Sequence, residues 1–262
     1  MRDGLCNNCG MQLIGRYCHA CGQQEVEDEW RSLGAIVRHL CDEIVSVDSK
    51  SLRSLMALLR PGHLSAEFIA GRRQAYLAPW KLYFLCAALF FLSAPLIAGF
   101  TFERHLTHDT GGEFRAMSEE RMAVTHMPPA IFAEHFDSHA KTVYTLAPLL
   151  SVLAMTLLLR MFYRSRFHRL GPHAVVAVHY VAFFYLVALG TGAIGEVLHP
   201  SDWLLLGLAQ SVLGVYLFVA LRRVYRERAG RTVAKTATLI VLAFAIDIPI
   251  NLGARLLTVA LT

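Results

Sequence analysis

The sequence lacks the motifs that identify most nucleotide-using and hydrolytic enzymes. It has no Walker phosphate-binding loop, no dinucleotide-binding fingerprint and no Gly-x-Ser-x-Gly nucleophile elbow. It has no His-Glu-x-x-His motif either, so the general base of that class of metalloproteases is missing. These absences favour a non-enzymatic role. A lipid-modifying enzyme stays a remote alternative, since the sequence offers it no visible nucleophile or base.

Charged residues are scarce: they make up 17% of the 262 residues, whereas 55% are hydrophobic and the mean hydropathy is +0.43. Soluble globular domains carry about 25% charged residues, so this composition excludes a soluble domain of this size. We predict an all-α integral membrane helical bundle of about five transmembrane helices, because a helix needs about 20 apolar residues to cross the hydrocarbon core. The predicted spans are 80–102, 142–163, 174–195, 203–221 and 236–260.

No secretory signal peptide precedes the first predicted span, so that span should itself direct insertion. Lys and Arg fill the connections on one side of the predicted bundle, near residues 72–81, 160–169 and 222–235. The opposite side has an outer loop at about 103–141, in which acids outnumber bases. The positive-inside rule therefore predicts a cytoplasmic N-terminus and a C-terminus outside.

The net charge of +5 and the pI near 9.0 do not by themselves indicate nucleic-acid binding. The basic residues cluster in loops next to the predicted spans, where they determine topology and contact anionic headgroups. We therefore expect membrane lipids, and no nucleic acid, among the partners of the chain.

Two Cys-x-x-Cys pairs stand near the N-terminus: Cys6 with Cys9, and Cys18 with Cys21. Thiolates at this spacing suit a tetrahedral structural zinc ion, and the glycine after each pair allows a tight turn. No histidine follows either pair, so covalent haem attachment is excluded. We predict a cytoplasmic zinc ribbon over residues 1–24, with zinc as a structural cofactor, because a reducing compartment keeps the thiolates available.

Residues 25–79 have the spacing of short amphipathic helices that are too short or too polar to span a membrane. We predict that these helices lie at the cytoplasmic face, with their apolar stripes toward lipid or toward the ends of the spans. A small soluble helical domain is the alternative. The predicted helices are 30–44, 51–60 and 65–70.

A series of short motifs precedes the first predicted span. The cysteine pairs end in Cys9-Gly10 and Cys21-Gly22-Gln23, a Pro61-Gly62 turn follows, and Gly71-Arg72-Arg73-x2-Tyr76-x2-Pro79 leads into the span. This pattern resembles a bacterial membrane protein family known as domain of unknown function 3667. The resemblance covers roughly the first third of the chain and implies an inner-membrane (cytoplasmic-membrane) protein with a cytoplasmic zinc ribbon. It implies no activity.

The last predicted span carries polar residues at a depth where apolar ones are expected. Asp247, Asn251 and Arg255 follow one another at steps of four, so they share one helical stripe. A carboxylate near mid-span costs several kcal/mol unless it is paired or faces a cavity. The stripe is therefore either a polar clamp between helices or part of a proton or substrate pathway. The residues of other spans that fall at comparable depth, and could hydrogen-bond to Asp247, are Ser151, Tyr185 and Gln210.

Two further pairs are candidate binding sites. Arg72 and Arg73 either anchor the chain at the anionic leaflet or form a patch that binds a phosphate or lipid headgroup. His135 and His139 lie one helical turn apart in the predicted outer loop. These two histidines either share a divalent ion or are solvated and titrate mildly.

For function, the pattern favours an interaction protein: the ribbon docks a cytosolic partner or a second copy of the chain, and the bundle anchors it or transmits the signal. The alternative is a small proton-coupled transporter or channel-like component. In that case Asp247, Asn251 and Gln210 would line the path.

Overall fold

The structure is a computed structural model, and it describes residues 5–15, 17–23, 49–93, 101–107, 109 and 112–262. These residues confirm the predicted all-α class, because their regular structure is helical apart from one isolated bridge between Leu5 and Gln12. The predicted helix at 30–44 lies outside the described residues. The helices are α2 (Ser49–Leu58), α3 (His63–Ile69), α4 (Pro79–Ser93), α5 (Phe102–Thr107), α6 (Glu113–Thr125), α7 (Pro129–Leu146), α8 (Pro148–Tyr163), α9 (Gly171–Leu198), α10 (Asp202–Tyr225) and α11 (Ala229–Leu261).

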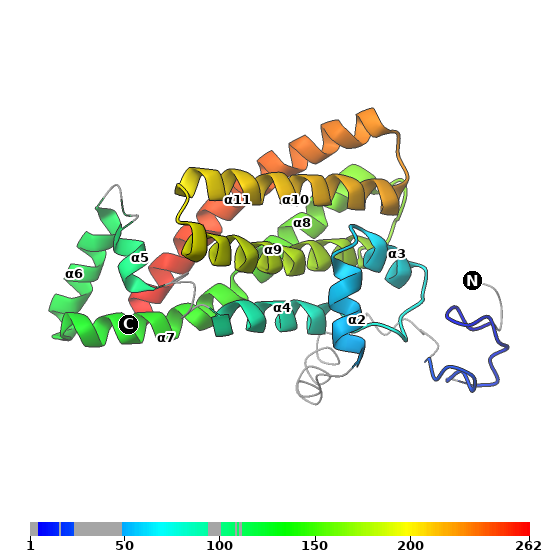
Figure 1. Cartoon of the computed structure of the whole chain (residues 1–262), viewed down its shortest axis with the longest axis horizontal. Helices are drawn as coiled ribbons and strands as arrows, with labels where there is room; N and C mark the ends of the chain where they lie inside the picture. The colour runs from blue at the N-terminus through cyan, green and yellow to red at the C-terminus, as the bar shows by residue number, and fades with distance from the viewer. Residues whose placement is uncertain (1–4, 16, 24–48, 94–100, 108, 110–111) are drawn as a thin grey trace.

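Local sequence explains where several helices begin and end. Proline occupies the first or second position of α4, α7, α8 and α9, where its missing N–H would have no partner in the helix anyway. Left-handed residues end α6, α9 and α10, at His126, His199 and Arg226 respectively. Between α7 and α8 the helix is interrupted at Ala147, directly before Pro148, and the chain changes direction there (Figure 1).

Four helical stretches are long and apolar enough to cross a membrane: Pro129–Tyr163, Gly171–Leu198, Trp203–Tyr225 and Ala229–Leu261. Within the described residues, four of the about five predicted spans therefore correspond to helices long enough to cross a membrane. The fifth candidate, α4, has 15 residues, which is about 22 Å of helix against a hydrocarbon core of about 30 Å. Residues 94–100, which belong to that predicted span, lie outside the described residues.

The long helices run along the long axis of the molecule, and α9 is the central one (Figure 1). It contacts α4, α8 and α10, and its buried side chains belong to the main hydrophobic core. The N-terminal segment and the C-terminus lie at opposite ends of the long axis (Figure 1). The basic connections α8–α9 and α10–α11 lie at the same end as the N-terminal segment.

Large apolar side chains cover the outside of the bundle, where a water-soluble protein would expose polar ones. On α11, only 11% of the most apolar stretch is buried. This distribution fits a bundle whose outer surface contacts lipid. Exposed examples are Leu153, Leu157, Trp203, Leu204, Val215, Val241 and Phe244.

The predicted outer loop is built of helices. It comprises α5, α6 and the first half of α7, which enclose a second, smaller core with the C-terminal part of α11. Phe102, Phe114 and Phe136 pack at ring-centroid distances of 5.5 to 5.6 Å in this core. The backbone N–H of Phe102 donates to Asp137 Oδ1 at 2.7 Å and joins α5 to α7. We call this helical group the cap.

At the opposite end, α2 and α3 pack against the bundle. Tyr216 Oη on α10 donates to the Leu58 carbonyl at 2.9 Å. Gly62, between α2 and α3, approaches α10 so closely that an added Cβ would lie 2.7 Å from Ala220 Cα. Leu58 of α2 and the apolar stripe of α3 therefore face the ends of the long helices. The other large apolar side chains of α2 are mostly exposed, as at Leu52 and Met56.

Candidate functional sites: a cysteine cluster and a cavity between the helices

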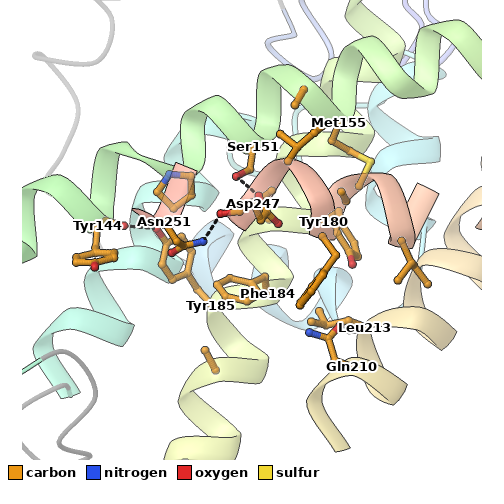
Figure 2. A pocket seen from close by; sticks show the side chains of 18 of the residues that line it. Tyr144, Ser151, Met155, Tyr180, Phe184, Tyr185, Gln210, Leu213, Asp247 and Asn251 are labelled. Carbon is orange, nitrogen blue, oxygen red and sulfur yellow. Dashed lines mark hydrogen bonds between the residues drawn. The ribbon is translucent and has the colours of Figure 1, made fainter. Parts of the chain in front are cut away.

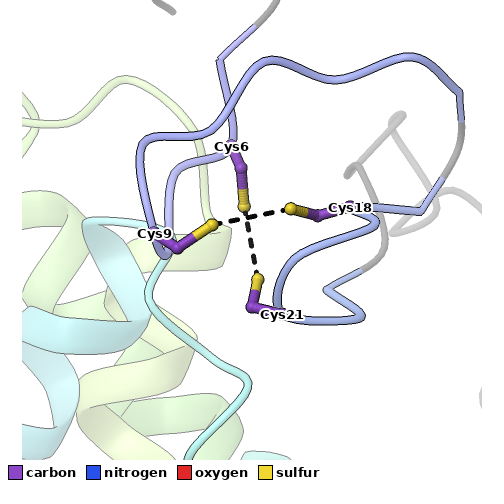
Figure 3. Close-up of side chains that lie close together, drawn as sticks. All are labelled: Cys6, Cys9, Cys18 and Cys21. Carbon is purple, nitrogen blue, oxygen red and sulfur yellow. Dashed lines mark hydrogen bonds between the residues drawn. The ribbon is translucent and has the colours of Figure 1, made fainter.

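The four cysteines of the N-terminal segment come together in space. The Sγ atoms of Cys6 and Cys21 are 3.6 Å apart, those of Cys9 and Cys18 are 3.5 Å apart, and all four lie within 4.8 Å of one another. Figure 3 shows the four sulfurs converging from two facing loops. All four thiols are free, so the geometry is that of ligands around a common centre.

This arrangement fits a tetrahedral metal ion. With a metal–sulfur bond of about 2.3 Å, the sulfurs of a tetrahedral site lie about 3.8 Å apart, close to the distances observed. The backbone N–H of Cys21, together with that of Ala20, hydrogen-bonds to Cys18 Sγ and lowers the pKa of the Cys18 thiol to about 6. A thiolate is the form that binds a metal, so Cys18 is the thiol prepared for a cation, whereas the pKa of Cys9 is raised to about 12. The four cysteines could therefore hold a metal ion.

The two loops are built alike. In each, the first cysteine donates its N–H to the carbonyl five residues later and accepts the N–H of the glycine four residues later, all at 2.8 to 2.9 Å. The glycines, Gly10 and Gly22, have φ of 78° and 69°, a left-handed conformation that glycine adopts at little cost. The Cys-Gly pairs in the sequence thus correspond to two equivalent turns.

The second of these loops packs onto the turn between α3 and α4. Gln23 Nε2 donates to the Gly71 carbonyl at 2.8 Å, and Gln23 Oε1 accepts the backbone N–H of Arg73 at 3.2 Å. Gly71 has φ of 86°, and a Cβ there would lie 2.9 Å from Asn7 Cβ of the first loop. Both loops of the cysteine cluster therefore contact this turn, which a side chain at position 71 would obstruct.

The two arginines of this turn have partners within the same segment. Arg72 Nε and Nη2 donate to the two carboxylate oxygens of Glu67 at 2.6 and 2.5 Å. This bidentate pair lowers the pKa of the Glu67 carboxyl. Arg73 Nε donates to the Phe68 carbonyl at 3.3 Å. A phosphate or headgroup would have to compete with Glu67 for Arg72, so headgroup binding by Arg72 and Arg73 stays a prediction.

A cavity of about 180 Å³ lies between the long helices. Its walls come from α4, α7, α8, α9, α10 and α11, and most of the lining is apolar or aromatic (Figure 2). Four of its lining residues, Phe184, Gln210, Phe244 and Asn251, are also exposed on the outside of the bundle. The cavity is therefore open at the side, next to α10 and α11.

Asp247 reaches this cavity from α11 and is half-buried. Its Oδ1 accepts a hydrogen bond of 2.6 Å from the Ser151 hydroxyl on α8. One turn later, Asn251 Nδ2 donates to the Asp247 carbonyl at 2.8 Å (Figure 2). The stripe read from the sequence thus has two of its members, Asp247 and Asn251, at the cavity.

The other residues of the predicted stripe have different positions. Gln210 and Tyr185 line the same cavity, yet the side-chain hydrogen bond described for the Asp247 carboxylate comes from Ser151. Tyr185 Oη instead donates to the Tyr144 carbonyl at 3.2 Å. Arg255 lies beyond the cavity beneath the cap, with its guanidinium carbon 6.0 Å from the centre of the Phe114 ring.

The histidine pair of the predicted outer loop lies on α7. The ring centroids of His135 and His139 are 6.5 Å apart, and His135 is exposed. Among the residues that the structure describes, the group of three or more metal-type ligands within reach of one ion is the cysteine cluster. A shared ion on this histidine pair stays a prediction without a third ligand.

Comparison with known families adds one match. Residues 48–91 match the family model described as Protein of unknown function (DUF3667). The resemblance predicted from the sequence is thereby confirmed for this segment. The four cysteines lie outside the matched residues. The chain matches no curated protein and no solved structure.

The DUF3667 segment comprises α2, α3, the following turn and most of α4. It contains Gly62, which approaches α10, and Gly71, which receives the cysteine cluster. The segment therefore joins the metal-type cluster to the helical bundle. These two close approaches explain the glycines at positions 62 and 71.

Sequence reasoning missed the most buried polar contact of this segment. Ser65 Oγ on α3 lies 2.9 Å from His179 Nδ1 on α9, and both residues are buried. Thr156, a hydroxyl residue that lies at similar depth along its helix, donates its Oγ1 hydrogen to the Val152 carbonyl of that helix. A contact between residues 114 positions apart leaves no local signal in the sequence.

The predicted absence of a dinucleotide-binding fingerprint is wrong in one respect, because a Gly-x-Gly-x-x-Gly string is present in the sequence. Gly190, Gly192 and Gly195 have the spacing of a dinucleotide-binding turn, but they lie inside α9. That fingerprint requires a turn between a strand and the N-terminus of a helix. Their position in the middle of a helix excludes this role.

Proposed function

We propose that the chain is a small proton-coupled transporter or channel-like component of the cytoplasmic (inner) membrane, with Asp247 as the group that exchanges a proton or binds a ligand. The observation that carries the proposal is the cavity that Asp247 enters, open at the side of the bundle and lined by Ser151, Gln210 and Asn251. A polar clamp would be expected to bury its carboxylate in a sealed helix contact.

The chemistry follows from the cost of charge at this depth. Ionised Asp247 is stabilised by the Ser151 hydroxyl, which donates to Oδ1. Protonation of the carboxylate removes a charge from a largely apolar cavity, and a bound cation would neutralise the same charge. Occupancy of the cavity and the charge state of Asp247 are therefore coupled, which is the requirement for proton-linked movement of a ligand.

Proton flux tests this proposal. Proteoliposomes with an internal pH dye and an imposed membrane potential should show faster acidification than protein-free vesicles. Asp247→Asn keeps the shape but cannot exchange a proton, so we expect at least a 10-fold loss of protein-dependent flux. Thr238→Val, an isosteric change on the exposed face of the same helix, should leave the flux unchanged. Unchanged flux in Asp247→Asn, with lower thermal stability, would instead identify a clamp.

The cysteine cluster supports a second part of the proposal. Four thiolates in tetrahedral array favour zinc over harder cations, and a closed four-ligand site builds structure without reacting. A cytosolic location would keep these thiols reduced. The basic connections lie at the same end of the molecule. Both features favour the orientation with the N-terminus in the cytoplasm and the C-terminus outside.

Docking of a protein partner or a second copy of the chain by this ribbon is the second candidate function. Its support is a set of apolar side chains that are exposed on the N-terminal cysteine segment. Exposed apolar patches of this kind mark interaction surfaces. Ile14 is 87% exposed and Tyr17 is 63% exposed. The remaining members of this exposed apolar set are Leu5 and Met11.

Site-specific crosslinking tests the docking role. A photo-crosslinking residue at Tyr17 should yield a discrete crosslinked product in intact cells. Ile14→Glu in the same chain should remove that product, because a charge replaces the most exposed apolar side chain of the set. Gln12→Glu adds the same charge at an exposed polar position and should keep the product. A product that survives Ile14→Glu would count against docking through this surface.

A further inference from the structure

We infer that the ligand of the Asp247 cavity is a monovalent organic cation with a compact apolar body. This inference rests on the proposed function, because it names the class of ligand for the same cavity. Three independent features of the described lining support it: its charge, its aromatic content and its size.

The charge of the lining has one sign. Among the described residues that line the cavity, Asp247 is the acid, and there is no Lys, Arg or His side chain. Ser151 stabilises the carboxylate by one hydrogen bond but contributes no charge. A carboxylate in such surroundings gains most from a cationic occupant, whereas an anion would meet repulsion and a neutral molecule would leave the charge uncompensated.

Aromatic rings from four helices, α4, α7, α9 and α11, line the cavity that Asp247 enters. Tyr180 and Tyr185 on α9 lie near Asp247 in Figure 2, and Phe91 on α4 and Phe244 on α11 complete the wall. The rings of Phe91 and Tyr185 have centroids 6.2 Å apart. Aromatic faces attract cations that have lost their water, and this attraction is the usual basis for recognising quaternary ammonium groups.

A metal cation is disfavoured by the same lining. Inorganic cations need several oxygen ligands in place of their water. Besides Asp247, the described lining offers only neutral oxygens, from two amide side chains, tyrosine phenols and the Ser151 hydroxyl, which already donates to the carboxylate. An ammonium that carries its own apolar substituents needs only one carboxylate and the surrounding rings.

The size of the cavity sets the size of the ligand. A protein cavity of about 150 Å³ accepts benzene, so 180 Å³ accommodates one ring with a small charged group. The exposed lining residues Gln210 and Phe244 place the opening at the side of the bundle. An amphiphilic cation dissolved in the bilayer interface could therefore enter without crossing the protein.

Binding of three matched probes to the purified full chain in lipid nanodiscs tests this inference. The probes are benzyltrimethylammonium, its uncharged carbon isostere neopentylbenzene, and benzenesulfonate as an anion of similar size. Calorimetric titration should detect the cation, with at least 10-fold weaker binding of the other two. Asp247→Asn should weaken the cation at least 10-fold, and Phe244→Leu should weaken it about 3-fold through loss of one aromatic face.

Thr238→Val serves as the control and should bind the cation as the wild type does. Equal affinity for the cation and its carbon isostere would overturn the inference. This comparison uses the wild-type chain alone, so it does not depend on whether a variant folds. Undiminished cation binding by a folded Asp247→Asn chain would overturn it as well. If wild-type vesicles carry protons in an Asp247-dependent way but the cation does not bind, the inference fails and the proposed function stands. If the vesicles show no Asp247-dependent proton flux and the cation does not bind, the proposed function and the inference both fail.

Discussion

Replacing Cys18 by serine should reduce the metal content of the purified chain from about one zinc ion to less than a tenth of that. The four sulfurs lie within 4.8 Å of one another, so each one is a candidate ligand of the same ion. Structural zinc contributes about 10 to 16 kcal/mol to the folding of small thiolate sites, and a weakened site loses most of this free energy. Elemental analysis after dialysis measures the effect, and Cys6→Ser should behave alike.

His19→Ser is the matched control, because His19 is an exposed residue next to Cys18. It should retain one zinc ion. Loss of the metal should also be detected in the turn before α4, where the Arg73 N–H donates to Gln23. Hydrogen exchange at that amide should accelerate in Cys18→Ser and after chelation. Retention of a full equivalent of zinc by both serine variants would refute the metal site.

Gly62→Ala should lower the free energy of unfolding by about 2 to 5 kcal/mol. Gly62 has φ of 68°, and an alanine Cβ would lie 2.7 Å from Ala220 Cα and 2.9 Å from the Ala220 carbonyl oxygen. The left-handed conformation costs alanine about 1 to 2 kcal/mol. The contact with backbone atoms adds about 1 to 3 kcal/mol, because a helix backbone cannot move aside as a flexible side chain can.

Gly112→Ala separates these two contributions. Gly112 has φ of 70°, but an added Cβ there meets nothing within 4 Å. It should therefore cost only the conformational part, about 1 to 2 kcal/mol. Thermal denaturation in one detergent, followed by helical circular dichroism, compares the two variants. Equal losses in both would mean that α3 and α10 do not approach as closely as described.

Composition predicts the class of the fold better than it predicts the boundaries of the helices. Apolar content predicted an all-α membrane bundle, and the described residues confirm that class with four sufficiently long apolar stretches. The helical stretch that contains the second predicted span begins earlier than that span, at Pro129. Hydropathy identifies residues that avoid water, but it does not distinguish burial in the cap from burial in the bundle. The residues of α7 are divided between these two environments.

For the candidate sites, too, the sequence predicted which residues lie together but not which of them form a hydrogen bond. The spacing of four between Asp247 and Asn251 predicted a shared stripe, and both residues reach one cavity. Depth along the helix suggested three partners for Asp247, and Ser151 is the one whose hydroxyl donates to it. Depth cannot decide among them, because it does not determine how each helix is rotated about its own axis.

By itself, the sequence determined the helical membrane class, the grouping of four cysteines as ligands and the position of an acid within a long apolar helix. These properties depend on composition and on spacings of a few residues. Helical geometry and thiolate chemistry convert such spacings directly into positions in space. Only the tertiary structure decided that Gln23 joins the cysteine cluster to Gly71, that Ser65 meets His179, and that α10 receives Gly62. Those contacts join residues 48 or more positions apart, and they arise because packing fixes the rotation and approach of whole helices.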